Sequence, residues 1–159
     1  YPGDAMRITT GGGIEHSEMP ADGAGCNGLQ LWVNLPREQK EAEPDYEDAG
    51  PDELPTEDVD GATVTTVVGE GSPLTLHTEM TYHDVRVEHS WEWTTPEGWA
   101  GFLFGVDGEG TIDGERFGKG DVVPATDAGG VTVEGEVRLV AVAGEPHGEP
   151  IQQRGPFVF

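Results

Sequence analysis

The sequence predicts an all-β protein. After residue 61, short runs rich in β-branched and aromatic residues follow one another, and Gly, Asp or Pro separates nearly all of them. Asp113-Gly114 lies between Thr111-Ile112 and Glu115-Arg116-Phe117, as a tight hairpin requires. No segment keeps a period of 3.6 residues. Seven or more short strands at this spacing are typical of a sandwich, a jelly roll or a barrel. The predicted runs are Thr63–Val68, Leu74–Val87, Trp99–Val106, Gly110–Ile112, Asp121–Val123, Val131–Val133 and Val137–Ala143.

Three further features bear on local structure. Gly28–Leu35 alternates apolar and polar residues and predicts a half-buried strand that ends at Pro36. Asp107-Gly108 predicts a second tight turn. Trp91 and Trp93 share one face, where large aromatic residues indicate core packing more often than a ligand pocket.

Residues 41–61 are strongly acidic and contain Pro44, Pro51 and Pro55. This composition favours a solvated linker without helix or strand. The single cysteine, Cys26, excludes an internal disulfide framework and is expected to be a small surface or half-buried residue.

The net charge is −23, from 31 acidic and 8 basic residues. A negative field of this size repels phosphate backbones, so direct nucleic-acid binding is not expected. Lysine is scarce, and acidic residues are spread over every segment. This composition favours a folded protein adapted to multimolar salt, where ionic screening removes the repulsion between its acidic side chains. No apolar run approaches the roughly 20 residues of a membrane helix, and no signal peptide is visible. We therefore expect a cytoplasmic protein without membrane contact.

His16 and Glu18 form an H-x-E pair directly after Gly11-Gly12-Gly13. On an extended chain, side chains two residues apart point the same way, about 6.6 Å apart at ~3.3 Å per residue. A site with one imidazole and one carboxylate ligand, and with further coordination positions left open, suits Fe(II), Mn or Ni better than a metal that prefers thiol ligands. The three glycines would let the backbone approach a neighbouring segment closely, or would permit a β-bulge that turns the pair inward. The competing interpretation is two polar surface residues.

The remaining histidines offer no obvious further ligands. His77, His83 and His89 are six residues apart, and six residues of strand span roughly 20 Å, so no two in one strand can share an ion. We interpret them as pairing or surface histidines. His147, in a Gly/Pro loop, is interpreted in the same way.

Four segments together resemble the pirin family of bicupins: GDAMRITTGGGIEHSEMP, GLQLWVNLP, EPDYED and AGEPHGEPIQQRGPFVF. The resemblance runs in order from Tyr1 to Phe159. It implies a double-stranded β-helix (cupin) fold with two barrels packed face to face and one non-haem metal in the first barrel. By the same resemblance, the family's N-terminal part and C-terminal helix have no counterpart here, and the first barrel is incomplete.

The resemblance also implies a ligand set. In the family, two histidines of an early H-x-H segment and the histidine and glutamate of H-x-E hold the metal. The second pair falls on His16 and Glu18, and the first pair would precede Tyr1. The implied metal is Fe(II) or another divalent transition metal, with Mn, Ni, Cu and Zn as alternatives. Binding by the present chain alone is expected to be weak or absent.

The second barrel is tested against the general cupin pattern H-x-H, three or four residues, E, six residues, G. With the glycine at Gly108, the glutamate position falls on Gly101. The histidine positions fall on Thr94 and Pro96, or on Thr95 and Glu97. None of these is a ligand set, so this barrel is expected to hold no metal.

The expected organisation has four parts: 1–40, the remainder of the metal-bearing cupin; 41–61, the linker; 62–147, the second cupin; and 148–159, a return segment. The resemblance implies quercetin 2,3-dioxygenase-type activity on a flavonol or other phenol in the intact protein, with the present chain inactive. The alternative is a non-enzymatic, metal-dependent module of the transcription-cofactor type that binds a protein partner.

Overall fold

The computed structural model describes residues 2–20, 23, 25, 27–125 and 129–155, and the backbone of residues 157–158. Cys26 lies outside the described residues. The described elements, in chain order, are β1 (Ala5–Thr9), η1 (Arg37–Gln39), β2 (Asp45–Ala49), η2 (Pro51–Glu53), β3 (Thr56–Val59), β4 (Ala62–Val68), β5 (Met80–Val87), β6 (Ser90–Trp93), β7 (Ala100–Ile112), β8 (Glu115–Gly118), β9 (Val122–Ala125), β10 (Val131–Gly144), β11 (Gln153–Arg154) and β12 (Phe157–Val158). The prediction of an all-β fold is confirmed.

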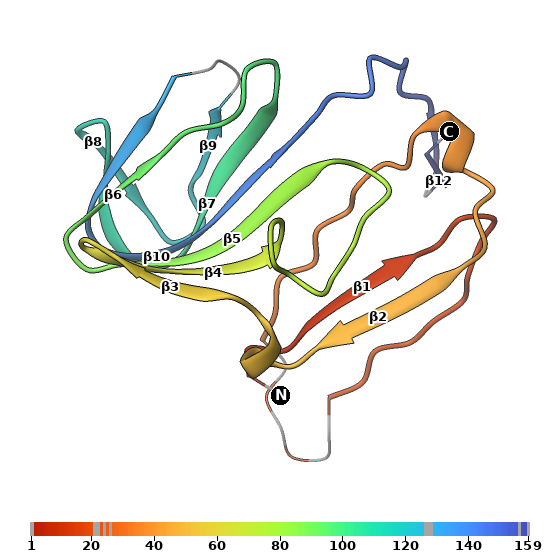
Figure 1. The fold of residues 1–159 in the computed structure, drawn as a ribbon, viewed down its shortest axis with the longest axis horizontal. Helices are drawn as coiled ribbons and strands as arrows, with labels where there is room; N and C mark the ends of the chain where they lie inside the picture. Colours follow the sequence, from red (N-terminus) through yellow and green to blue (C-terminus); the bar gives the residue numbers. More distant parts are fainter. Residues whose placement is uncertain are drawn as a thin grey trace.

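Strand β10 is the centre of the large sheet. Along one edge, residues 137–144 pair with β5 and residues 131–134 pair with β6. Along the other edge β10 pairs with β7, which in turn pairs with β8 and β9. Strands β4 and β3 extend the sheet beyond β5. Figure 1 shows the sheet curling at its left end, where β6, β7, β8 and β9 surround a common interior. The result is the barrel of a cupin-type double-stranded β-helix.

The barrel interior is apolar because alternate residues of each strand point into it. The largest fully buried side chains are those of Phe117, Leu103, Leu139, Val85 and Val133. Trp91 and Trp93 belong to the same core and stack with ring centroids 6.3 Å apart. Their interpretation as core residues is confirmed.

The hairpin at Asp113-Gly114 is confirmed, since Ile112 pairs with Glu115 across it. The turn predicted at Asp107-Gly108 is wrong, because both residues lie inside β7. The register of β7 against β10 shifts at this point, between Arg138 and Leu139, and Gly108 has a φ of 77°. A glycine with a positive φ occurs inside a strand next to a bulge as well as in a tight turn, so the dipeptide alone does not distinguish them.

The prediction that residues 41–61 contain no strand is also wrong. Strand β2 pairs with β1, and strand β3 pairs with β4. Acidic residues fit here because β3 is an exposed edge of the large sheet, where charges protect the edge from further pairing. In β2, two of the carboxylates bind an arginine of β1.

The strand predicted at Gly28–Leu35 is wrong as well. No segment of the described chain pairs with it, and only Leu31, Asn34 and Leu35 are half-buried. Trp32 is 72% exposed. Alternation favours a strand only where a neighbour accepts the backbone hydrogen bonds.

The two-stranded sheet β1–β2 lies beside the barrel (Figure 1). A second, smaller apolar cluster of Ala49, Leu54 and Leu74 joins them, with Ala5 and Val67 packed against it. The boundaries predicted at residues 40, 61 and 147 stay predictions. None of the helices in the described ranges has the length and apolar character to cross a membrane.

Truncation of Leu103 tests the barrel core. Leu103 is fully buried, so Leu103→Ala should lower the free energy of unfolding by about 2–5 kcal/mol. Val122 on neighbouring β9 is 56% exposed, so Val122→Ala should cost less than about 1 kcal/mol. Urea unfolding followed by tryptophan fluorescence measures both, and equal losses would contradict this core.

Candidate metal centre

The candidate ligands follow a tight turn at the end of β1. Gly13 N donates to Thr10 O at 2.8 Å, and Gly12 N donates to Ala42 O at 3.2 Å. Gly11 has a φ of 46°, and a Cβ at Gly11 would lie 1.8 Å from Ala42 O. The glycine run therefore lets the chain pass directly against the backbone that leads into β2, which is the close approach predicted from the sequence.

His16 and Glu18 follow this turn, and both side chains are exposed to solvent. Neither lies in a strand, so no ladder of hydrogen bonds holds them at strand spacing. Within the described residues, no three side chains of His, Cys, Asp or Glu are grouped so that they could hold an ion. His16 and Glu18 offer one nitrogen and one oxygen donor, and a catalytic metal site usually needs a third or fourth ligand. Their assignment as ligands stays a prediction.

A network around Arg7 fixes the strand that leads to the pair. The Arg7 side chain, only 10% exposed, donates from Nη2 to Asp45 Oδ2 at 2.8 Å and from Nε to Glu47 Oε2 at 3.2 Å. A third donor reaches Thr9 Oγ1 at 2.8 Å. Glu47 Oε2 also accepts Thr75 N at 3.1 Å. The network thus ties β1 to β2 and ties β2 to the connection between β4 and β5.

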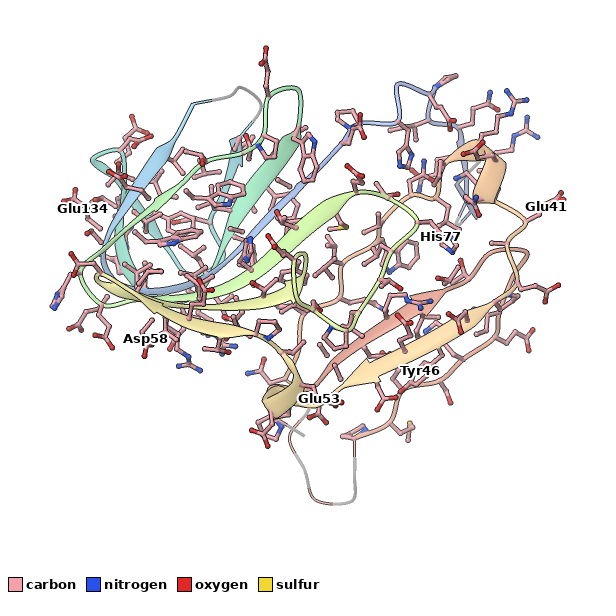
Figure 2. The ribbon with its side chains drawn as sticks, viewed as in Figure 1. Glu41, Tyr46, Glu53, Asp58, His77 and Glu134 are labelled. Atoms are coloured by element: carbon pink, nitrogen blue, oxygen red, sulfur yellow. The ribbon has the colours of Figure 1, made fainter. Side chains whose placement is uncertain are left out.

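The same arginine sets the electrostatics of β2. Its hydrogen bonds lower the pKa of Asp45 and of Glu47 below their ordinary values, and the backbone at Thr75 lowers the Glu47 pKa further. His77 on the β4–β5 connection also lowers the Asp45 pKa. Figure 2 shows His77 on that connection and Tyr46 on β2.

Sequence reasoning missed this network. Arg7 and Thr9 are two residues apart on β1, and Asp45 and Glu47 are two residues apart on β2, so each pair lies on one face of its strand. A spacing of two is the pattern that predicts a strand. The acidic composition of residues 41–61 concealed it, because the arginine that compensates two of the charges lies 38 residues or more away in sequence.

The other histidines agree with their interpretation as pairing or surface residues. His77 and His89 are exposed. His83 is half-buried, with Nδ1 3.3 Å from Thr66 Oγ1, and His147 Nε2 lies 3.0 Å from Thr78 Oγ1.

One open hollow of about 650 Å³ lies between η1 and the segment after β10. Its walls are Pro36, Arg37, Glu38, His147 and Glu149, and Arg37 N donates to Glu149 Oε2 at 2.9 Å. Neither predicted metal ligand lines it.

Comparison with known proteins agrees with this architecture. Residues 82–159 match the family model for the pirin C-terminal cupin domain. The crystal structure of GK1651 from Geobacillus kaustophilus has a TM-score of 0.82 at 30% identity, covering 92% of this chain and 65% of that one. Quercetin 2,3-dioxygenase from Acinetobacter baumannii has a TM-score of 0.70 at 25% identity, covering 80% and 45%. The fold and these matches define a cupin protein.

The family follows from sequence similarity over nearly the whole chain. Pirin from Rattus norvegicus is 34% identical over 176 residues, which is 99% of this chain. The chain belongs to the pirin family. It spans 59% of the length of the rat protein.

The turn before the pair is tested by two alanine substitutions. Gly11→Ala should destabilise β1–β2 by more than about 1 kcal/mol, because a Cβ there meets Ala42 O and the φ is positive. Gly12→Ala is the matched control, since a Cβ there meets nothing within 4 Å. Amide hydrogen exchange of β1 and β2 measures both. Equal protection in the two variants would show that the turn is not constrained.

The Arg7 network predicts a pH dependence for β1–β2. The pKa values of Asp45 and Glu47 lie below the ordinary 3.8 and 4.5, so their contribution is present above these values and is lost as the pH falls through the lower folded pKa values. Arg7→Met should therefore reduce β1–β2 protection above these values and remove the part of its pH dependence that comes from Asp45 and Glu47. Arg116→Met removes an exposed pair with Glu109 and should leave β1–β2 unchanged. Carboxylate titrations by NMR measure the two pKa values directly, and an unchanged Glu47 pKa in Arg7→Met would contradict the network.

Proposed function

We propose that this chain is part of a metal-binding, pirin-like cupin protein with quercetin 2,3-dioxygenase-type activity in the intact protein, and that His16 and Glu18 are two ligands of its metal. The observation that carries the proposal is the exposed imidazole and carboxylate, two residues apart, directly after a turn that Gly11 holds against Ala42. Family membership and the similarity to the Acinetobacter dioxygenase support it.

The bound metal, Fe(II) or another divalent transition metal, would act as a Lewis acid and orient a phenolic substrate. The His16 imidazole supplies a neutral nitrogen donor, and the Glu18 carboxylate supplies an oxygen donor. A carboxylate at this position is also a base for the hydroxyl proton of a flavonol, whose phenolate is the more electron-rich form. Two further ligands would come from an upstream H-x-H segment of the kind that the family resemblance implies.

A second candidate function is a non-enzymatic, metal-dependent module that binds a protein. It is favoured by exposed apolar side chains: Met6 on β1 is 45% exposed, Tyr46 on β2 is 55% exposed, and Trp32, between these strands in the sequence, is 72% exposed. The net charge of −23 would favour a basic partner protein over nucleic acid.

Metal binding by matched variants tests the ligand assignment. The chain alone should bind Mn(II) or Fe(II) weakly, and the chain extended at its N-terminus by the H-x-H segment of a pirin relative should bind one ion. In that longer protein, His16→Ala and Glu18→Gln should each weaken binding at least about tenfold, a loss of roughly 1.4 kcal/mol. His89→Ala removes an exposed histidine of the β5–β6 turn and is the control. Equilibrium dialysis at high salt, which suppresses non-specific binding to the acidic surface, gives the affinities.

Turnover separates the two functions. The iron-loaded longer protein should consume quercetin under O2, and His16→Ala should abolish this. Absence of iron-dependent consumption, together with a stoichiometric basic protein partner, would support the binding module and reject the dioxygenase.

A further inference from the structure

The three methionines of the chain differ strongly in exposure. Met19 is 85% exposed, Met6 is 45% exposed and Met80 is 8% exposed. Met80 begins β5 and pairs with Gly144 of β10, and Met6 lies on β1, where it pairs with Asp48 of β2. In the described chain Met19 lies outside every strand. The fold therefore protects the three thioether groups to three different degrees.

The segment around Met19 leaves its side chain open to small molecules. Residues 14–20 are all exposed, and in the part of the chain that the structure describes none of them takes part in a hydrogen bond. Met19 belongs to neither of the two apolar clusters. A small oxidant therefore reaches the Met19 side chain without any opening of the fold, whereas the Met80 side chain stays covered until the sheet opens locally.

A methionine thioether is oxidised to the sulfoxide by peroxides. The sulfur lone pair attacks one oxygen of hydrogen peroxide, and an S–O bond forms as the O–O bond breaks. The sulfur is oxidised, the peroxide is reduced, and its second oxygen leaves as water. Hydrogen peroxide is uncharged, so the field of a chain with a net charge of −23 does not repel it, as it would repel an anionic oxidant.

The position of Met19 decides what its oxidation changes. Met19 follows Glu18 directly in the sequence. Oxidation converts an apolar thioether into a polar sulfoxide, and at an exposed residue outside both apolar clusters it removes no core contact. Methionine sulfoxide reductases reduce the sulfoxide again, and the exposure of Met19 gives them access to it. The chemistry at this position is therefore reversible in the folded chain.

We propose that Met19 is a reversible peroxide-oxidation site, and that its oxidation changes the polarity of the surface next to Glu18 while the fold stays intact. Met19 is oxidised before Met6 and long before Met80, and a reductase restores it. The order follows from the exposure of the three side chains. It depends neither on a bound metal nor on turnover.

Residue-resolved mass spectrometry of the whole chain, treated with hydrogen peroxide, tests the proposal. A chelator is present throughout, so that no metal-bound oxidant forms. In the folded chain Met19 should gain one oxygen at least about tenfold faster than Met80, with Met6 between them. In urea the three methionines should react at similar rates, which would show that the fold sets the order. The two methionine sulfoxide reductases, one for each epimer, should then return Met19 to the thioether in the folded chain.

Three variants complete the test. Met6→Leu and Cys26→Ser should leave the rate at Met19 unchanged, because the thioether reacts with the peroxide directly. Oxidation of Met19 should leave the urea midpoint unchanged, as should Met19→Leu. Four results would overturn the proposal: Met6 or Met80 reacting as fast as Met19 in the folded chain, loss of Met19 oxidation in Cys26→Ser, a Met19 sulfoxide that the reductases do not reduce, or a urea midpoint that oxidation lowers in the unmodified chain but not in Met19→Leu.

Discussion

Strand β10 carries the fold, because it is hydrogen-bonded along both edges over nearly its whole length. Residues 131–144 hold β6 and β5 on one side and β7 on the other, and β4, β8 and β9 attach only through those neighbours. Its inward side chains Val133, Val137, Leu139 and Ala141 are all buried in the main core. Backbone pairing and apolar burial therefore coincide on one strand, and the bulge opposite Arg138 bends the sheet around them.

The candidate site depends on a much smaller set of contacts. Strands β1 and β2 attach to the barrel through the cluster of Ala49, Leu54 and Leu74 and through the hydrogen bonds of Glu47. Arg7 compensates two carboxylates there, in a chain with a net charge of −23. Salt screening would reduce the remaining repulsion, and adaptation to high salt stays a prediction. The pair His16 and Glu18 therefore follows a strand whose buried apolar cluster is much smaller than the core of the barrel beside it.

The sequence patterns correctly predicted the structural features that depend on residues close together in the chain. The Asp113-Gly114 hairpin, strand β4 and the buried tryptophans follow from turn chemistry, β-branched runs and aromatic spacing. What sequence could not show depends on partners distant in the chain. Strands β2 and β3 were concealed by their acidity, Asp107-Gly108 divided β7 into two predicted runs, and Gly28–Leu35 has no neighbour in the described chain. The same holds at the site: the H-x-E motif identified His16 and Glu18, but only the structure showed Gly11 against Ala42 and Arg7 between two carboxylates.

The central functional claim is that His16 and Glu18 are ligands and not merely two polar groups on an acidic surface. Site-resolved paramagnetic broadening of the amide resonances by substoichiometric Mn(II), at a salt concentration that screens the acidic surface, tests it most directly. We predict that the signals of residues 15–19 broaden first, with the acidic strands β2 and β3 little affected. Broadening spread over the acidic segments, with residues 15–19 unaffected, would contradict it.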